Sequence, residues 1–219
     1  GAFSGIKLFF QEPYILGIFS MLFFYEMFNM VLNYQRLHIA QITYDTISGR
    51  TGFLFHQMFI THFIGLFIAF FGTGTLLKWL GERKCLLLIP LGTALFIIYF
   101  LFSFSPTAII IAYIGVRTIN YAFSYPVRES LYIPTVKEMK FKSKSWIDAF
   151  GVKMAKATGH SFNAFVDVIC QNMYFAAHAI FFGAMIGLWF VAAYLLGKRF
   201  QRAVDNNEVI GEKDITTKS

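Results

Sequence analysis

The chain has 219 residues, of which 57% are hydrophobic and only 14% are charged, and its mean hydropathy is +0.57. These values exclude an ordinary soluble domain and indicate a polytopic helical membrane protein. The formal net charge of +7 is not by itself a nucleic-acid signature. Most of the basic residues fall in loops on one predicted side, so no nucleic-acid partner is expected.

Six apolar segments are long enough to cross a bilayer core, which requires about 20 residues. The predicted spans are residues 14–33, 53–77, 85–104, 107–125, 146–171 and 174–197. We therefore predict an all-α fold with six transmembrane helices over residues 14–197. Residues 1–13 form a lead-in, residues 37–52 a polar loop, residues 126–145 a basic connection and residues 198–219 a frayed hydrophilic tail. The start, Gly-Ala-Phe-Ser-Gly, is typical of an internal piece of a longer protein.

Basic residues concentrate on one predicted side of the membrane. With six spans, eleven of them lie on the side that holds both termini: Lys78, Arg83, Lys84, Arg128, Lys137, Lys140, Lys142, Lys144, Lys198, Arg199 and Arg202. The opposite loops carry Arg36 and Arg50. This asymmetry assigns the basic side, including the tail, to the cytoplasm.

Two of the predicted spans carry a stripe of polar residues at helical spacing. The stripe of the fifth span consists of Lys153, Lys156, His160, Asn163 and Asp167, which follow one another at intervals of 3, 4, 3 and 4 residues. The stripe of the first span consists of Glu26, Asn29, Asn33 and Arg36. Residues at these intervals share one face of an α-helix, and within a membrane such a face must meet protein or a water-filled cavity.

Further charges lie in and after the fourth span. Arg117 is near its middle, where an arginine costs about 2.5–3.5 kcal/mol on insertion scales. It is either functional or paired with Glu26 or Asp167. Arg128 and Glu129 follow Pro126, and a gating salt bridge, a structural tie of the loop and contact with a substrate all remain open for them.

Enzyme and metal signatures are missing from the sequence. There is no Gly-x-x-x-x-Gly-Lys-Ser/Thr loop, no His-Glu-x-x-His and no Gly-x-Ser-x-Gly. We expect no enzymatic activity, no cofactor and no metal site. Cys85 and Cys170 are expected as buried thiols, and His56, His62 and His178 as packing residues rather than ligands.

Several motifs resemble known transporters. Lys78-Trp-Leu-Gly-Glu-Arg-Lys84 resembles the cytoplasmic turn of the major facilitator superfamily. The stretch from Arg117 to Lys156 resembles the bacterial and plastid type of ATP/ADP antiporter. The matching motifs are Tyr121-Ala-Phe-Ser-Tyr-Pro-Val-Arg-Glu-Ser-Leu-Tyr-Ile-Pro134, Ser143-Lys-Ser-Trp-Ile-Asp148, Ala155-Lys-Ala-Thr-Gly159 and Asn29-Met-Val-Leu-Asn-Tyr-Gln-Arg36.

The resemblance implies the C-terminal six helices of a twelve-helix carrier, which exchanges ATP against ADP by alternating access. The implied partners are a nucleotide, the lipid bilayer and an N-terminal six-helix half. The implied location is a bacterial inner membrane or the inner envelope of an organelle.

The resemblance, together with the polar stripes, also suggests roles for individual residues. The candidate substrate-binding residues are Arg117, Lys156, Arg36, Asn29, Asn33, Tyr121 and Asn163. The candidates for gating or coupling are Glu26, Arg128, Glu129, Lys144, Asp148, Lys153, His160 and Asp167.

The chain departs from the family pattern at Leu32, Asn120, Tyr125 and Thr158. Because these are charged or close-packed positions in the family, a proton-coupled importer of other nucleotides or organic anions stays open as an alternative. A reading from another class is a membrane scaffold or receptor that does not transport, but the buried charges speak against it, because scaffolding does not require them.

Overall fold

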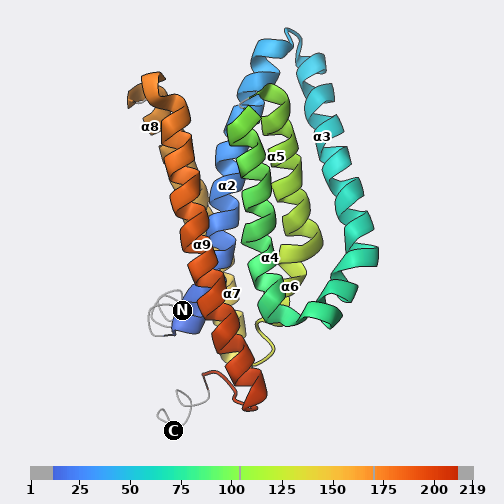
Figure 1. The fold of residues 1–219 in the computed structure, drawn as a ribbon, viewed down its shortest axis with the longest axis vertical. Helices are drawn as coiled ribbons and strands as arrows, with labels where there is room; N and C mark the ends of the chain where they lie inside the picture. The colour runs from blue at the N-terminus through green and yellow to red at the C-terminus, as the bar shows by residue number, and fades with distance from the viewer. Residues whose placement is uncertain (1–11, 104, 170, 212–219) are drawn as a thin grey trace.

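The computed structural model describes residues 12–103, 105–169 and 171–211. Within these ranges the chain is helical almost throughout, and its sole β-type pairing is a bridge between Thr135 and Ile210. Figure 1 shows the long helices side by side in one bundle. The prediction of an all-α fold is confirmed.

Among the described residues, four helical stretches are long and apolar enough to cross a membrane, compared with six predicted spans. They are Pro13–Thr43, Ile47–Ser103, Pro106–Ser130 and Tyr174–Asp205. The first is α2 and the last is α9. Their length and composition support a membrane-embedded protein.

The stretch Ile47–Ser103 comprises α3 (Ile47–Ile68), a π-helical turn η1 (Ala69–Thr73) and α4 (Gly74–Ser103). A straight helix of its 57 residues would be about 85 Å long, far more than a hydrocarbon core of about 30 Å. It is broken at Gly81, whose φ of 71° and ψ of 164° are not helical. The chain reverses there, so that α3 and α4 run in opposite directions (Figure 1). The turn expected at residues 78–84 is confirmed.

The fourth predicted span was expected to end at Pro126, and this expectation is wrong. α5 (Pro106–Ile119) continues through the π-helical turn η2 (Asn120–Ser124) into α6 (Tyr125–Ser130). Proline has no N–H to donate to the carbonyl four residues earlier, which belongs to Ala122. The Thr73 hydroxyl donates a hydrogen bond to that carbonyl instead. The helix therefore passes the proline without leaving a buried acceptor unpaired.

The basic connection 126–145 is largely helical rather than a loop. After α6, a short turn leads into α7 (Lys137–Trp146), the π-helical turn η3 (Ile147–Gly151) and α8 (Val152–Ile169). These three form a rod that covers the fifth predicted span. The rod is not among the four apolar stretches, and α8 carries the polar stripe that lowers its hydropathy.

The first loop is much shorter than predicted. α2 extends to Thr43 and α3 begins at Ile47, so residues 37–52 are mostly helical. The Thr46 hydroxyl accepts a hydrogen bond of 3.1 Å from the Gly49 N–H and caps α3. Arg36, which was counted as a loop residue, is buried within α2.

The predicted frayed tail is ordered over residues 198–211. A 3₁₀ turn η4 (Gln171–Met173) precedes α9, which runs to Asp205. The chain then folds back, and the Ile210 N–H donates to the Pro134 carbonyl at 2.7 Å. Residues 212–219 of the expected tail, and the lead-in before Glu12, lie outside the described residues.

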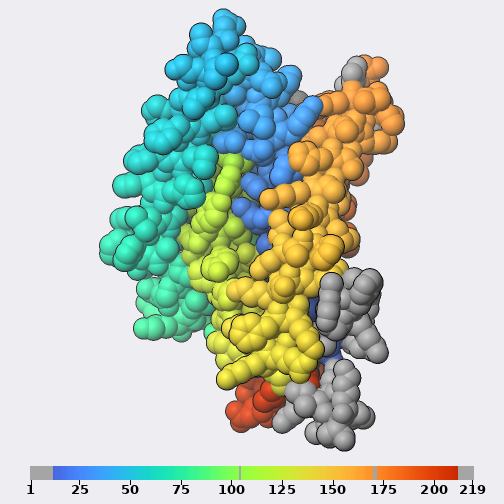
Figure 2. All heavy atoms as spheres, turned by 180° about the vertical axis from the view of Figure 1, so that it is seen from behind, coloured from blue at the N-terminus to red at the C-terminus, as the bar shows by residue number. Residues whose placement is uncertain are grey.

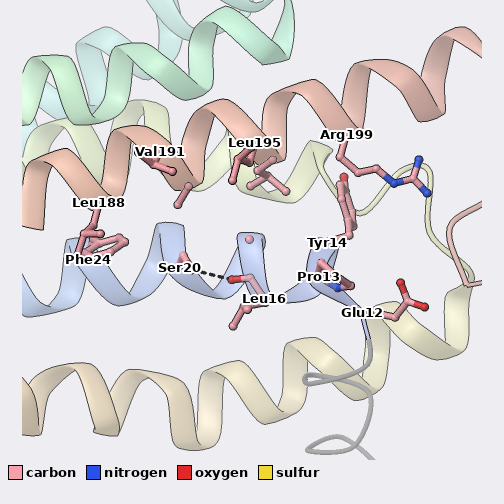
Figure 3. Close-up of a pocket in the computed structure, with 13 residues that line it drawn as sticks. Glu12, Pro13, Tyr14, Leu16, Ser20, Phe24, Leu188, Val191, Leu195 and Arg199 are labelled. Carbon is pink, nitrogen blue, oxygen red and sulfur yellow. Dashed lines mark hydrogen bonds between the residues drawn. The ribbon is translucent and has the colours of Figure 1, made fainter.

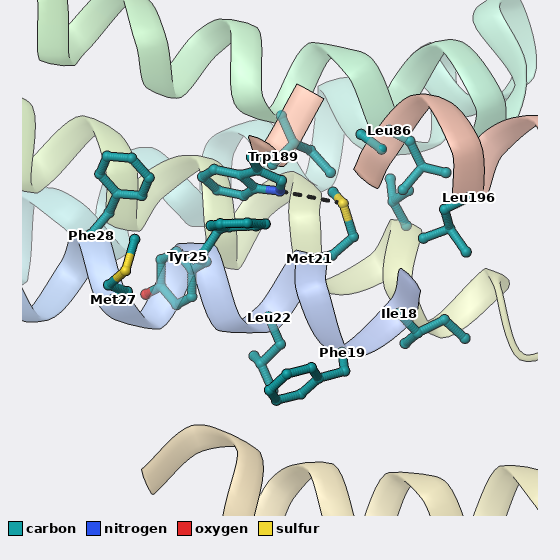
Figure 4. Packing of buried hydrophobic residues seen from close by; sticks show 14 of the residues in the cluster. Ile18, Phe19, Met21, Leu22, Tyr25, Met27, Phe28, Leu86, Trp189 and Leu196 are labelled. Carbon is teal, nitrogen blue, oxygen red and sulfur yellow. Dashed lines mark hydrogen bonds between the residues drawn. The ribbon is translucent and has the colours of Figure 1, made fainter. Parts of the chain in front are cut away.

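The centre of the bundle is α2, which packs on α5, α8 and α9. Trp189 of α9 is fully buried against it, with its ring stacked on Phe28 at 5.7 Å between centroids. Its indole N–H points at the Met21 sulfur, 3.3 Å away (Figure 4). Cys85 is a buried free thiol, as expected, whereas Cys170 lies outside the described residues.

The three basic segments lie at one end of the bundle. Figure 1 places the α3–α4 reversal, the α6–α7 connection and the C-terminal end of α9 together at the bottom. The α2–α3 loop is at the opposite end. The eleven basic residues predicted to share a side therefore belong to segments that do share one end of the molecule.

Gly159 brings α8 against α2. A Cβ atom at this position would lie 2.9 Å from the Met27 carbonyl oxygen and 2.9 Å from the Met30 Cβ. We expect Gly159→Ala to lower the free energy of unfolding by about 1–3 kcal/mol, as overpacking does. Thermal unfolding in detergent measures the change.

The matched control is Gly183→Ala in α9, where an added Cβ meets nothing within 4 Å. It should leave stability unchanged or raise it by up to about 1 kcal/mol, because alanine favours the helix. Equal melting temperatures for the two variants would contradict the close approach of α8 to α2.

Candidate functional site

Two arginines from different helices share one tyrosine ring. The Arg36 guanidinium carbon in α2 is 4.0 Å from the centroid of the Tyr113 ring in α5, and that of Arg117 is 5.3 Å from the same centroid. Tyr113 is buried, and its π face attracts both cations. The fold therefore brings together two of the predicted substrate-binding cations.

Arg117 is held by tyrosines rather than by a carboxylate. It donates hydrogen bonds to the hydroxyls of Tyr113 and Tyr121, which lie four residues before and after it on the same helical face. The carboxylates proposed as its ion-pair partners lie against other groups. Glu26 is paired with Lys156, and Asp167 accepts a hydrogen bond from Tyr34. The structural ion pair considered for Arg117 is therefore not formed.

Several polar atoms around the two arginines are buried without a protein partner. Arg36 donates to the side-chain oxygen Oδ1 of Asn33 at 2.8 Å, but its Nε and one terminal nitrogen have no acceptor among the described residues. The Arg117 Nε is also buried and has no acceptor among the described residues. Because buried polar groups are normally hydrogen-bonded, three unpaired guanidinium nitrogens at one place indicate a site for an acceptor-rich ligand.

The polar stripe of α8 supplies a third cation. The Lys156 ammonium is 3.9 Å from the Glu26 carboxylate of α2. Asn163 is buried and neither polar atom of its amide has a partner, and the Asn29 side-chain oxygen is unpaired as well. These groups continue the polar surface from α2 onto α8.

This surface lies in a groove. Figure 2 shows α2 set back between the α5–α6 rod on one side and α8 on the other. Tyr121 is exposed on the α5 side, with its ring 5.1 Å from that of His62 in α3. Lys153 and His160 are exposed on the α8 side. The stripe was expected to face protein or a water-filled cavity, and for these two exposed residues the cavity stays a prediction.

The remaining gating candidates meet at the basic end. Arg128, Glu129, Lys144 and Asp148 line a small cavity of about 90 Å³. The Lys144 ammonium donates a hydrogen bond to the Glu129 carboxylate at 2.6 Å. Arg128 is buried, with its guanidinium 6.0 Å from the Tyr125 ring.

A second polar cluster connects α2 with α8 and α9. Tyr34 donates to Asp167, and Gln35 contacts the fully buried His178 at 3.2 Å. The His178 Nδ1 is 2.9 Å from the Tyr174 carbonyl, which only accepts. This nitrogen therefore carries the proton and Gln35 donates to Nε2, so His178 is a neutral packing residue, as predicted.

Sequence reasoning missed Tyr113, Tyr34 and Gln35. Tyr113 had a detectable signal, because it lies one helical turn before Arg117 and could be found by spacing. Tyr34 and Gln35 adjoin the α2 stripe but do not share its face, so spacing alone could not select them.

No family model, curated protein or solved structure matches the chain. The likeness to nucleotide antiporters therefore depends on the motifs quoted above.

The pair formed by Lys144 and Glu129 should be measurable in a double-mutant cycle. Both side chains are about one-third exposed, at 35% and 33%, so solvent screening limits the coupling to about 0.5 kcal/mol. We expect this value from the stabilities of Glu129→Gln, Lys144→Gln and the double variant.

The control is the surface pair of Lys142 and Glu138, whose side chains are 44% and 60% exposed. Its coupling should be below about 0.3 kcal/mol. If the first pair couples no more strongly than the second, α6 and α7 are not tied by this contact.

Proposed function

We propose that the chain forms a six-helix half of a membrane carrier that exchanges nucleotides, ATP against ADP, by alternating access. The observation that carries the proposal is the pair of guanidinium groups on Tyr113. Both belong to helices apolar enough to cross a membrane. Intramembrane charges of this kind usually mark substrate pathways.

In this proposal the chain crosses the membrane six times. The crossings are α2, residues 47–80, residues 82–103, the α5–α6 rod, the α7–α8 rod and α9. The α7–α8 rod is too polar to face lipid all round. Its polar stripe borders the groove, while Met154, Phe165 and Val168 are exposed on the remaining surface. A helix with one polar and one apolar exposed side suits a position between an aqueous cavity and lipid.

The groups in the groove suit a phosphorylated, aromatic substrate. Arginine binds phosphate through paired N–H donors and lysine binds it as a point charge, so Arg36, Arg117 and Lys156 would hold the phosphates. The exposed Tyr121 offers a ring on which a base could stack. Asn29, Asn33 and Asn163 supply hydrogen bonds for ribose or phosphate.

The basic end of the groove supplies a gate in the same proposal. The ion pair of Lys144 and Glu129 connects α7 to α6 beside the buried Arg128. Alternating access requires one end of the pathway to close while the other opens. A partly exposed ion pair suits this task, because its small net strength lets it break and re-form.

Arg117→Ala should weaken ATP binding by about 1.5–3 kcal/mol, the value for hydrogen bonds to a charged group. Arg117→Lys should recover part of the loss, because the charge is kept but the forked geometry is not. The loss should be smaller for AMP, which has fewer phosphates. Equilibrium binding of labelled nucleotides to the purified protein measures these changes.

The control is Arg202→Ala, which removes an exposed arginine from the end of α9. It should bind ATP like the parent protein. A folded Arg117→Ala variant with the parent's affinity for ATP would overturn the phosphate role, and stronger binding of a non-nucleotide anion would favour the carrier of other anions.

The proposed orientation places the basic end of the bundle in the cytoplasm. Single cysteines at the exposed positions Lys84, Lys142 and Asn207 should resist impermeant thiol reagents in intact cells, in a background free of other cysteines. A cysteine at Asp45, in the loop at the opposite end, should react. The reverse pattern would invert the topology.

A further inference from the structure

A second cavity lies away from the polar groove. It is a trough of about 620 Å³ between the start of α2 and the second half of α9. Leu16 and Phe24 of α2 and Leu188, Val191 and Leu195 of α9 form its walls, and most of them are exposed (Figure 3). The trough is therefore an apolar surface that opens to the outside of the bundle.

The trough is polar at one end only. Figure 3 shows Glu12, Tyr14 and Arg199 at one end and Leu188 and Phe24 at the other. From Arg199 to Leu188 is eleven residues, or about 16 Å of helix, which matches one leaflet of a hydrocarbon core of about 30 Å. The polar end coincides with the basic end of the bundle.

The side-chain hydroxyls that line the trough among the described residues already donate their hydrogens within the protein. The Ser20 hydroxyl donates to the Leu16 carbonyl of its own helix at 2.8 Å, and the Tyr14 hydroxyl donates to the Leu131 carbonyl at 2.6 Å. An extended peptide would bring backbone N–H and C=O groups that this surface cannot satisfy within a membrane. An alkyl chain carries no such groups and suits the trough.

The polar end carries complementary charges. Arg199 binds Glu208 through two terminal nitrogens, at 2.6 and 2.7 Å, and keeps further N–H donors for a phosphate. Glu12 lies at the same end and is partly exposed. A phosphate beside Arg199 and an ammonium beside Glu12 would match both signs.

We propose that the trough between α2 and α9 binds a phospholipid of the adjacent leaflet, with one acyl chain along Val191 and a zwitterionic headgroup between Arg199 and Glu12. This lipid site lies between α2 and α9, away from the polar groove. Its occupation does not depend on the nucleotide exchange proposed above.

The test places the photoreactive residue p-benzoylphenylalanine at Val191, in the trough, or at Ile180, which is exposed on the same helix but outside it. Each protein is reconstituted with phosphatidylethanolamine or phosphatidylglycerol, purified in detergent and irradiated, and the adducts are identified by mass spectrometry. Phospholipid adducts should form at Val191 and be scarce at Ile180, because detergent removes lipid that is not specifically bound. Phosphatidylethanolamine should give the higher yield.

Arg199→Ala should reduce the Val191 adduct about tenfold, the loss expected for one hydrogen bond to a charged group. Glu208→Gln is the matched control. It breaks the same ion pair but keeps the arginine, so the adduct should persist. Equal adducts at Val191 and Ile180 would overturn the proposal. So would a cross-link from Val191 to residues 1–11 or to a second copy of the chain, or an equal yield with phosphatidylglycerol.

Discussion

The guanidinium groups of Arg36 and Arg117 carry the same charge and yet meet on one tyrosine ring. Each contact with the ring is worth about 0.5–2 kcal/mol, and the two cations repel each other. The arrangement persists because α2 is fixed by its buried contacts with α5, α8 and α9. The apolar core therefore holds the cations where neither forms an ion pair with a carboxylate of the described residues, and this makes the groove attractive to an anion.

The position of Arg128 depends on how the chain passes Pro126. The π-helical turn before it shifts the helical register, and the Thr73 hydroxyl occupies the Ala122 carbonyl that the proline leaves unpaired. Without this turn, Arg128 would point in another direction relative to Arg117. π-helical turns often occur at functional sites, and this one lies between the arginine pair and the cluster at the basic end.

The hydropathy of the sequence predicted the helical fold, the reversal at Gly81 and the grouping of basic segments at one end, because apolar length and charge asymmetry act locally. It did not predict the helix beyond Pro126, which depends on Thr73, a residue 49 positions from Ala122. Nor did it predict the ordered chain after α9, where Glu208 and Ile210 find partners brought by folding. Spacing placed Arg36 and Arg117 on polar faces, but only the packing of α2 on α5 placed them on the same ring.

The balance of charge along the groove indicates which ligands it can accept. The Glu26 carboxylate is attracted electrostatically by Lys156, Arg128 and Arg117. Arg36 lies beside Arg117. Three cations therefore act on one carboxylate, and a fourth cation lies beside one of the three. The contact of Lys156 with Glu26, at 3.9 Å, is too long for a hydrogen bond, so the lysine can turn to another partner at little cost. Buried cations in excess require an anion to be stable in a membrane, and a ligand with several negative charges meets that requirement better than one with a single charge.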